Sequence, residues 1–462
     1  MSARRRPWPQ ALLAALGLAL LCAAAWVLLW PHPPQRAQAQ PAPKAQKSPQ
    51  KAPPSAAPDA SDALRAAQDA RTHALSAFKA VSGHAVRLAV QGASGPLEAA
   101  RRLHASSPEQ VFEALSLSPA RGAVSGGKHV RWAPRRPRGK IRYITMVPRD
   151  YDPRRPWPVH FSLHGGGSHG TPERSCQMNW QGEAAAKGVI LVCPRMKGGA
   201  WWVDEGERRV LAVLEDLRGW LNVDEAQVSL GGASSGAAGS WHLAMKFPWM
   251  WRAIAPRCSA TPEEVEALGN MAKVPVFLMH GFYDGTILVQ QSRDTHALLK
   301  ARAHDVRYYE DPGHGHHFMH HQNGPMIDWM SARRCAGPQK RFEYRTVAHG
   351  QVPGRVHWIR PRWSDGGYGS GQRLAGVLEQ RGDGGWVARI EGDAPLEGLT
   401  VLLPDGSASI PVQVHYNGQV VYTGRVAPSV GAVLESWWDH RRRAWLTRRA
   451  VRITLSQGKE SH

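Results

Sequence analysis

The chain of 462 residues is poor in cysteine and in acidic side chains. It has 5 cysteines and no C-x-x-C pair, so a zinc ribbon is disfavoured. Asp and Glu number 37 against 58 Lys and Arg, which gives a formal net charge of +21 at pH 7. The sequence also lacks an H-E-x-x-H frame and clustered carboxylates, which argues against a metal-dependent hydrolase. We therefore expect no metal and no cofactor.

The excess of positive charge is compatible with nucleic acid, an anionic membrane or an acidic polymer as a partner. However, no nucleic-acid-binding motif appears, and the arginines are scattered rather than gathered on one helix. We expect no nucleic-acid partner and interpret the charge mainly as a solvated surface, with an anionic envelope polymer left open. A hydrophobic fraction of 42% is typical of a folded protein.

A long apolar run lies near the N-terminus. Residues 11–30, ALLAALGLALLCAAAWVLLW, carry no charge and follow three arginines at positions 4–6. About 20 apolar residues span a bilayer, whereas the apolar core of a cleaved signal has about 7–15. We therefore expect residues 1–30 to be a single-pass transmembrane signal anchor, with the rest of the chain in the periplasm or outside the cell. An A-x-A sequence at 37–39 leaves signal cleavage and secretion open.

Export would place the cysteines in an oxidising compartment. Four of them lie beyond the apolar run: Cys176, Cys193, Cys258 and Cys335. They allow up to two disulfides with three possible connectivities.

Four further segments follow the anchor. Residues 31–60 are rich in Pro and Ala and predict a linker, and residues 61–128 predict a helical region in which SPEQVFEAL begins with a capping serine. Residues 129–338 alternate short apolar strands with helical stretches, which predicts an α/β fold with a mainly parallel sheet. Residues 339–462 predict a mostly β accessory domain with a hairpin turn at Asn417-Gly418.

The sequence SLGGASSGAAGS at 229–240 holds a G-x-S-x-G frame. Gly232 and Gly236 flank Ser234, an apolar strand is expected at 226–230, and a helix is expected at 239–247. A strand that turns sharply into a helix holds a nucleophilic serine in a strained turn, and small neighbours let the two elements approach. A flexible linker explains neither the strand nor the helix.

A serine hydroxyl needs a base, and the base needs an orienting acid. Asp284 follows the strand expected at 274–281, and His316 follows the strand expected at 305–313. The order serine, acid, histidine is the one found with such elbows. An early strand also ends in LHGGG, where the N–H groups of Gly165 and Gly166, joined by that of Ser235, could stabilise an oxyanion.

Together these motifs give the stretch from about 130 to 335 a resemblance to the α/β-hydrolase superfamily. The matching motifs are H-G-G-G at 164–167, G-x-S-x-G at 232–236, H-G-x-x-D at 280–284 and G-x-G-H at 313–316. The stretch most resembles exported esterases and prolyl-oligopeptidase-like hydrolases, including polyhydroxybutyrate depolymerases and feruloyl esterases. The resemblance implies Ser234 as nucleophile, Asp284 as orienting acid and His316 as base. It implies a serine hydrolase that acts on small or polymeric carboxylic esters.

Several alternatives stay open. Asp311 competes with Asp284, and four histidines compete with His316: His314, His317, His320 and His321. The pairs His316/His320 and His317/His321 have the i, i+4 spacing of helical metal ligands. Trp201 and Trp202 are expected to line a pocket or the core. The alternative functions are a serine peptidase of prolyl-oligopeptidase type and a non-catalytic α/β-hydrolase-like protein that binds polysaccharide.

Overall fold

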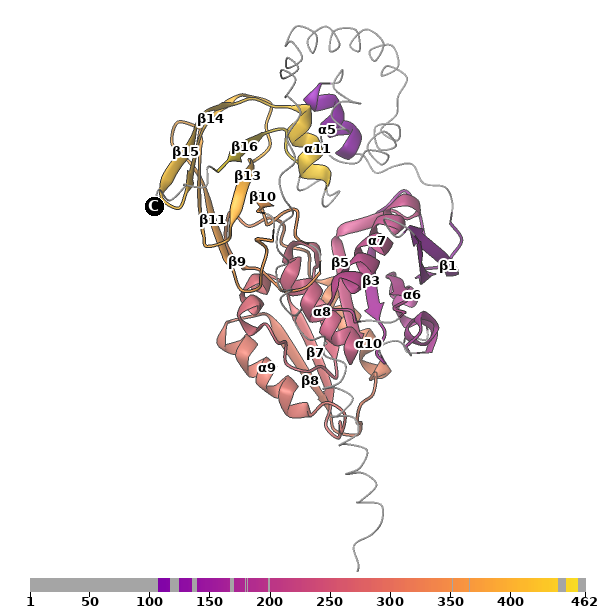
Figure 1. The fold of residues 1–462 in the computed structure, drawn as a ribbon. Coiled ribbons are helices and arrows are strands. Elements are labelled where there is room, and N and C mark those ends of the chain that lie inside the picture. Colours follow the sequence, from indigo (N-terminus) through magenta and orange to yellow (C-terminus); the bar gives the residue numbers. More distant parts are fainter. Residues whose placement is uncertain are drawn as a thin grey trace, which may run out of the picture. The chain divides into compact units, whose positions relative to one another are not determined.

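The computed structural model describes residues 107–116, 124–134, 139–166, 170–178, 180, 182–197, 200–350, 352–364, 366–438 and 446–455 (Figure 1). The predicted anchor at 1–30, the linker at 31–60 and most of the predicted helical region lie outside these residues. Within the described ranges, no helix has the length and hydropathy needed to span a bilayer.

Helix α5 (Pro108–Ser116) is the described part of the predicted helical region. It begins with a reciprocal cap, because Ser107 Oγ accepts the Gln110 N–H at 3.2 Å and the Ser107 N–H donates to Gln110 Oε1 at 3.0 Å. This capping box satisfies two donors at the helix start. The predicted capping serine is confirmed.

An eight-stranded sheet carries the central part of the chain, in the order β1-β2-β4-β3-β5-β6-β7-β8. Its strands are β1 (Gly127–Pro134), β2 (Lys140–Val147), β3 (Trp157–Leu163), β4 (Ile190–Pro194), β5 (Val223–Ala233), β6 (Ile254–Arg257), β7 (Val276–Gly281) and β8 (Val306–Asp311). Strand β2 is antiparallel to both neighbours, and all pairs from β4 to β8 are parallel. The predicted mainly parallel sheet is confirmed, and its strand order is α/β-hydrolase-like.

Helices cover both faces of this sheet (Figure 1). They are α6 (Glu183–Ala186), α7 (Asp204–Trp220), α8 (Ser235–Lys246), α9 (Val289–Ala301) and α10 (Asn323–Ser331). Successive strand residues alternate between the faces: Ile190 and Val192 join the core that includes residues of α7, α8 and α9, whereas Leu191 joins the core formed with α6 and α10. Both faces are apolar, as a parallel sheet requires.

The described residues of the C-terminal part form two further sheets and one helix. A five-stranded sheet has the order β15-β14-β12-β11-β9, and a three-stranded sheet has the order β10-β13-β16. The elements are β9 (Arg341–Arg345), β10 (Ile359–Trp363), β11 (Arg373–Gln380), β12 (Trp386–Gly392), β13 (Leu396–Leu402), β14 (Ile410–Tyr416), β15 (Gln419–Val426), α11 (Val430–Trp438) and β16 (Ala450–Thr454). Asn417 and Gly418 both have positive φ between β14 and β15, so the predicted hairpin turn is confirmed.

The C-terminal strands share one apolar core with the large sheet. Tyr344 on β9 belongs to the same cluster as Trp249, and their ring centroids lie 6.0 Å apart. The Tyr344 hydroxyl donates to the carbonyl of Lys246 at 3.0 Å, and Asn270 Nδ2 donates to the carbonyl of Arg345 at 2.8 Å. Burial of this contact therefore contributes to the stability of both parts.

One disulfide joins Cys176 to Cys193, which links the short helix η2 (Arg174–Met178) to β4. Cys258 and Cys335 are free thiols. Cys258 is buried and donates to the carbonyl of His317 at 3.3 Å, and Cys335 donates to the carbonyl of Trp249 at 2.8 Å. The two free thiols therefore bond to backbone oxygens and not to each other.

Candidate active site

Ser234 lies in a sharp turn between β5 and α8. Its φ is 55° and its ψ is −120°, a conformation that L-residues with side chains rarely adopt. The Ser234 N–H donates to the carbonyl of Arg257 at 2.9 Å, which ties the turn to the end of β6. The backbone is thus strained at the residue that the sequence singles out as the nucleophile.

The flanking glycines are required by close packing. A Cβ on Gly232 would lie 2.6 Å from the carbonyl oxygen of Leu163, and a Cβ on Gly236 would lie 2.2 Å from the same atom. A Cβ on Gly165 would lie 3.2 Å from Ser234 Cβ. No side chain fits at 232 or 236 without moving β3. The two glycines therefore allow β5 and α8 to pack closely against the end of β3 and the loop at Gly165.

Asp284 and His316 form the predicted pair. His316 Nδ1 lies 2.7 Å from Asp284 Oδ2, and His280 Nε2 lies 3.1 Å from the same oxygen. The other carboxylate oxygen, Oδ1, accepts the N–H groups of Thr286 at 2.8 Å and Ile287 at 2.9 Å. Burial raises the pKa of Asp284, but the Ile287 N–H, the His316 ring and the Thr286 N–H outweigh it and lower the pKa below its ordinary value. An ionised Asp284 accepts the Nδ1–H of His316 and leaves Nε2 available.

Asp311, the alternative acid, has different partners. Its Oδ1 lies 2.8 Å from His314 Nδ1, and its Oδ2 lies 3.1 Å from His321 Nε2. Asp311 also accepts the N–H of Gly313 at 3.0 Å and lies at the end of β8. It therefore orients the neighbouring histidines and not His316.

The two i, i+4 histidine pairs do not lie on a helix. Residues 312–319 are non-helical, so His316 and His320, and likewise His317 and His321, do not gain the shared face that this spacing implies. Among the described residues, the one group with metal-ligand proximity is Cys258, Asp284 and His316, whose ligand atoms lie within 4.8 Å of one another.

Cys258 lies beside Asp284, and this neighbour was not predicted from the sequence. It follows β6, which lies between β5 and β7, and its φ is 47°. Burial raises the pKa of this thiol to about 11, so it stays protonated at neutral pH beside the Asp284 carboxylate. Its position directly after a parallel strand could have indicated that it lies near Asp284, because the carboxyl ends of parallel strands meet at one edge of the sheet.

His164 orients the peptide bond between Gly165 and Gly166. The Met196 N–H donates to His164 Nε2 at 3.0 Å, so the ring proton lies on Nδ1 and donates to the carbonyl of Gly165 at 3.1 Å. Burial lowers the pKa of His164, which favours this neutral ring. Because the peptide is planar and trans, the Gly166 N–H points opposite to that carbonyl. Ser235 is the first residue of α8, where backbone N–H groups have no intrahelical acceptor.

Ser234 is not hydrogen-bonded to the histidine. Among the described residues, no hydrogen bond joins Ser234 Oγ to His316. Residues at the end of β6 lie next to both. The carbonyl of Arg257 accepts the Ser234 N–H, and the thiol of the next residue, Cys258, lies within 4.8 Å of a His316 ring nitrogen. Catalytic hydrogen bonds without substrate are often long and shorten when substrate binds.

A cavity of about 550 Å³ lies beside Ser234. It is lined by Trp202, Ser234, Ser235, Ala238, Trp241, His242, Met245, Ala260, Thr261, Pro262, Glu263, Glu264, Ile287, Ala348 and His349. Trp202 thus lines the cavity and Trp201 is buried in the core, as the sequence predicts. Ala348 and His349 come from the loop after β9, so the C-terminal part contributes to this cavity.

A buried charge cluster holds that loop in place, and no sequence motif predicted it. Glu207 on α7 is fully buried, with its Oε1 at 2.5 Å from His242 Nε2 and 2.9 Å from Lys246 Nζ. Lys246 also donates to the carbonyl of His349. A Cβ on Gly350 would lie 2.1 Å from Glu207 Oε1. Glycine at 350 is therefore needed for the loop to pack on the carboxylate.

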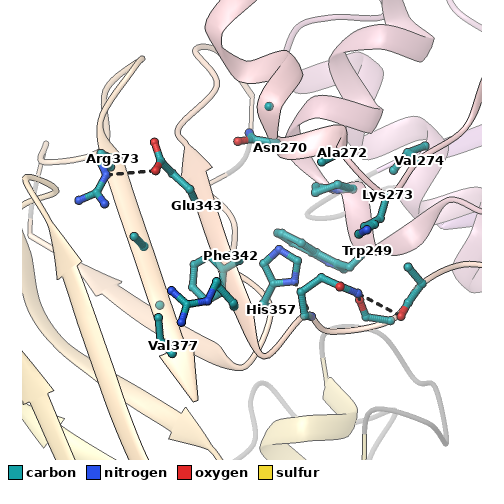
Figure 2. A pocket seen from close by; sticks show the side chains of 18 of the residues that line it. Trp249, Asn270, Ala272, Lys273, Val274, Phe342, Glu343, His357, Arg373 and Val377 are labelled. Carbon is teal, nitrogen blue, oxygen red and sulfur yellow. Dashed lines mark hydrogen bonds and ion pairs between the residues drawn. The ribbon is translucent and has the colours of Figure 1, made fainter. Parts of the chain in front are cut away.

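A second cavity, of about 570 Å³, lies where β9 and β11 meet residues 269–274 (Figure 2). Its apolar wall contains His357, whose ring stacks on Phe342 at 4.6 Å and meets Trp249 at 5.6 Å. None of Ser234, Asp284 and His316 lines it. Of these three residues, Ser234 lines the cavity described first, and we therefore take that cavity as the candidate active site.

Similarity searches find partial structural likenesses. No protein-family model matches the chain, and no curated protein matches it. A thermostable esterase is 22% identical with a TM-score of 0.41, over 45% of this chain and 63% of that protein. A ferulic acid esterase is 14% identical with a TM-score of 0.40, over 46% of this chain and 99% of that protein. A putative dipeptidyl aminopeptidase IV from Bacteroides ovatus is 15% identical with a TM-score of 0.38, over 45% of this chain and 36% of that protein. The strand order and the elbow, rather than these likenesses, define the fold.

Proposed function

We propose that this chain is a serine hydrolase that cleaves carboxylic esters. The observation that carries the proposal is the turn at Ser234, where a non-glycine residue at φ 55° follows a strand and immediately precedes a helix. Such strain is costly and persists where the surroundings impose it, as at catalytic residues. The hydrogen-bonded Asp284–His316 pair supports it, with 2.7 Å between Oδ2 and Nδ1.

The proposed reaction uses the residues described above. Ser234 Oγ attacks the ester carbonyl as His316 Nε2 takes its proton, and Asp284 holds the imidazole through Nδ1. The N–H groups of Gly165, Gly166 and Ser235 stabilise the oxyanion. The alcohol leaves with a proton from His316, and water activated by the same ring then hydrolyses the acyl-enzyme. No cofactor is required.

The size of the cavity supports a small-molecule ester or the end of a polymer. Cavities of roughly 300–1,000 Å³ enclose small ligands, and the cavity beside Ser234 measures about 550 Å³.

Replacement of the nucleophile tests this function. Ser234→Ala should lower turnover of p-nitrophenyl butyrate at least about 1,000-fold and abolish labelling by a fluorophosphonate, because no other hydroxyl takes its place. Ser331→Ala, which changes an exposed serine on α10, is the control and should leave both unchanged. Retained labelling of Ser234→Ala would contradict the assignment. Turnover of peptide anilides with no ester turnover would favour the peptidase.

We also propose that the enzyme is exported and held in the membrane by residues 1–30, with its catalytic part outside the cytoplasm. The Cys176–Cys193 disulfide supports an oxidising compartment. Cell fractionation with N-terminal sequencing should find the intact chain in the membrane fraction. A soluble chain that begins near residue 40 would show cleavage instead. The surplus of positive charge supports an anionic envelope polymer as a further partner.

A further inference from the structure

The cavity beside Ser234 differs in charge from the rest of the chain. The chain carries a net charge of +21, but the described residues that line this cavity include two carboxylates and no Lys or Arg. The carboxylates belong to Glu263 and Glu264. Glu263 is exposed, and no hydrogen bond or ion pair joins it to another described residue. Its negative charge therefore has no local partner there.

Glu264 is held rigidly in the wall of the cavity. It is half-buried, and its Oε1 accepts the N–H of Ala348 at 2.6 Å and the hydroxyl of Ser370 at 2.7 Å. Nearby Lys246 is paired with the buried Glu207 at 2.9 Å, so its charge is already offset. The carboxylates of Glu263 and Glu264 therefore leave the cavity with a surplus of negative charge.

Two indole rings line the same cavity. Trp241 is fully buried, and its Nε1 donates to Ser259 Oγ at 2.9 Å, whereas Trp202 is only partly buried and is the indole that a ligand in the cavity can reach. The face of an indole ring attracts a cation, most strongly where water is excluded. Carboxylates and indole faces together recognise an alkylated ammonium group better than either a neutral or an anionic group.

We propose that the substrate of this site is an ester that carries an ammonium group, bound by Glu263, Glu264 and Trp202 while its carbonyl lies at Ser234. This inference rests on the proposed function, because Ser234 makes the cavity a substrate site. It names the substrate class that the fold alone leaves open.

A pair of isosteric esters tests the proposal. Butyrylcholine and 3,3-dimethylbutyl butyrate have the same shape and differ by one positive charge. The wild type should prefer the cationic ester by about tenfold in kcat/KM, and this ratio should fall towards 1 in Glu263→Gln/Glu264→Gln. Glutamine at 264 keeps an acceptor for the Ala348 N–H, so the wall is preserved. Glu266→Gln, an exposed change nearby in η4 (Val265–Met271), is the control and should keep the wild-type ratio.

The outcomes separate the two proposals. If the phosphonate labels Ser234 but the wild type does not prefer butyrylcholine, or the double variant keeps the preference, the cationic substrate is wrong and the hydrolase stands. If neither labelling nor ester turnover occurs, the proposed function is wrong, and calorimetric titration with the butyltrimethylammonium ion decides the charge question. Binding that the double variant loses supports the cation site, and no binding overturns it.

Discussion

At the scale of single residues, the glycines around Ser234 determine whether the turn can form. The carbonyl of Leu163 lies where a Cβ on Gly236 would be placed, at 2.2 Å, and backbone atoms cannot move aside as a flexible side chain can. The frame thus has a packing role that is separate from the chemistry of the serine.

Gly236→Ala should therefore lower the free energy of unfolding by about 3 kcal/mol and reduce phosphonate labelling of the folded fraction. Gly219→Ala is the matched control, because Gly219 is also helical and a Cβ there meets no atom within 4 Å. That change should raise stability by about 0.5–1 kcal/mol. Urea unfolding of both variants measures the difference. Equal stability would contradict the packing role.

At the scale of elements, the loop after β9 connects the C-terminal part to the chemistry. Ala348 and His349 line the cavity, and Gly350, at φ 77°, packs against Glu207 on α7. A change at the loop should therefore alter binding of the proposed substrate without altering Ser234, the proposed nucleophile.

Gly350→Ala should raise KM for p-nitrophenyl butyrate while Ser234 stays reactive towards the phosphonate, because the added methyl collides with the Glu207 carboxylate. Gly384→Ala is a matched control, since Gly384 has the same φ of 77° and open space around its Cβ position. Both variants carry the same backbone strain, so a KM change in Gly350→Ala alone shows the effect of the loop. Equal KM values for Gly350→Ala and Gly384→Ala would show that the loop does not affect substrate binding.

The turn at Ser234 and the Asp284–His316 pair could be predicted from the sequence, because each residue follows a predictable strand and lies within a short local motif. Cys258 and Glu207 could not be. The role of Cys258 depends on β6 being placed between β5 and β7, and Glu207 lies against His242 and Lys246 on α8 and against a loop more than a hundred residues later. Local patterns predict which elements form, whereas such long-range neighbours follow from the assembled sheet.

At the scale of the whole molecule, buried histidines make stability depend on pH. Burial, followed by the charge of Arg355, lowers the pKa of His357 to about 3. Its unfolded-state pKa is about 6.5. Below pH 6.5 the unfolded chain binds a proton that the folded chain does not, so stability falls as the pH drops towards 3.

His357→Asn should reduce this loss. Asn tolerates the φ of 51° at this position, and its side-chain oxygen can accept the Gln339 N–H that now donates to His357 Nδ1 at 3.1 Å. Between pH 6.5 and 5, the wild type should lose about 2 kcal/mol more stability than the variant. Urea unfolding at several pH values measures the slopes, with exposed His320→Asn as control. Parallel slopes for wild type and His357→Asn would refute it.

The shared core of the two parts has a consequence for the timing of synthesis. The loop that completes the cavity, with Ala348 and His349, lies 32–33 residues after His316. A ribosome adds about 5–20 residues per second, so roughly 2–7 s pass between the synthesis of His316 and that of His349. The nascent chain therefore lacks a finished cavity while its three predicted catalytic residues are already made. The proposed substrate site should form only after the loop that follows β9 has been made and has packed against Glu207.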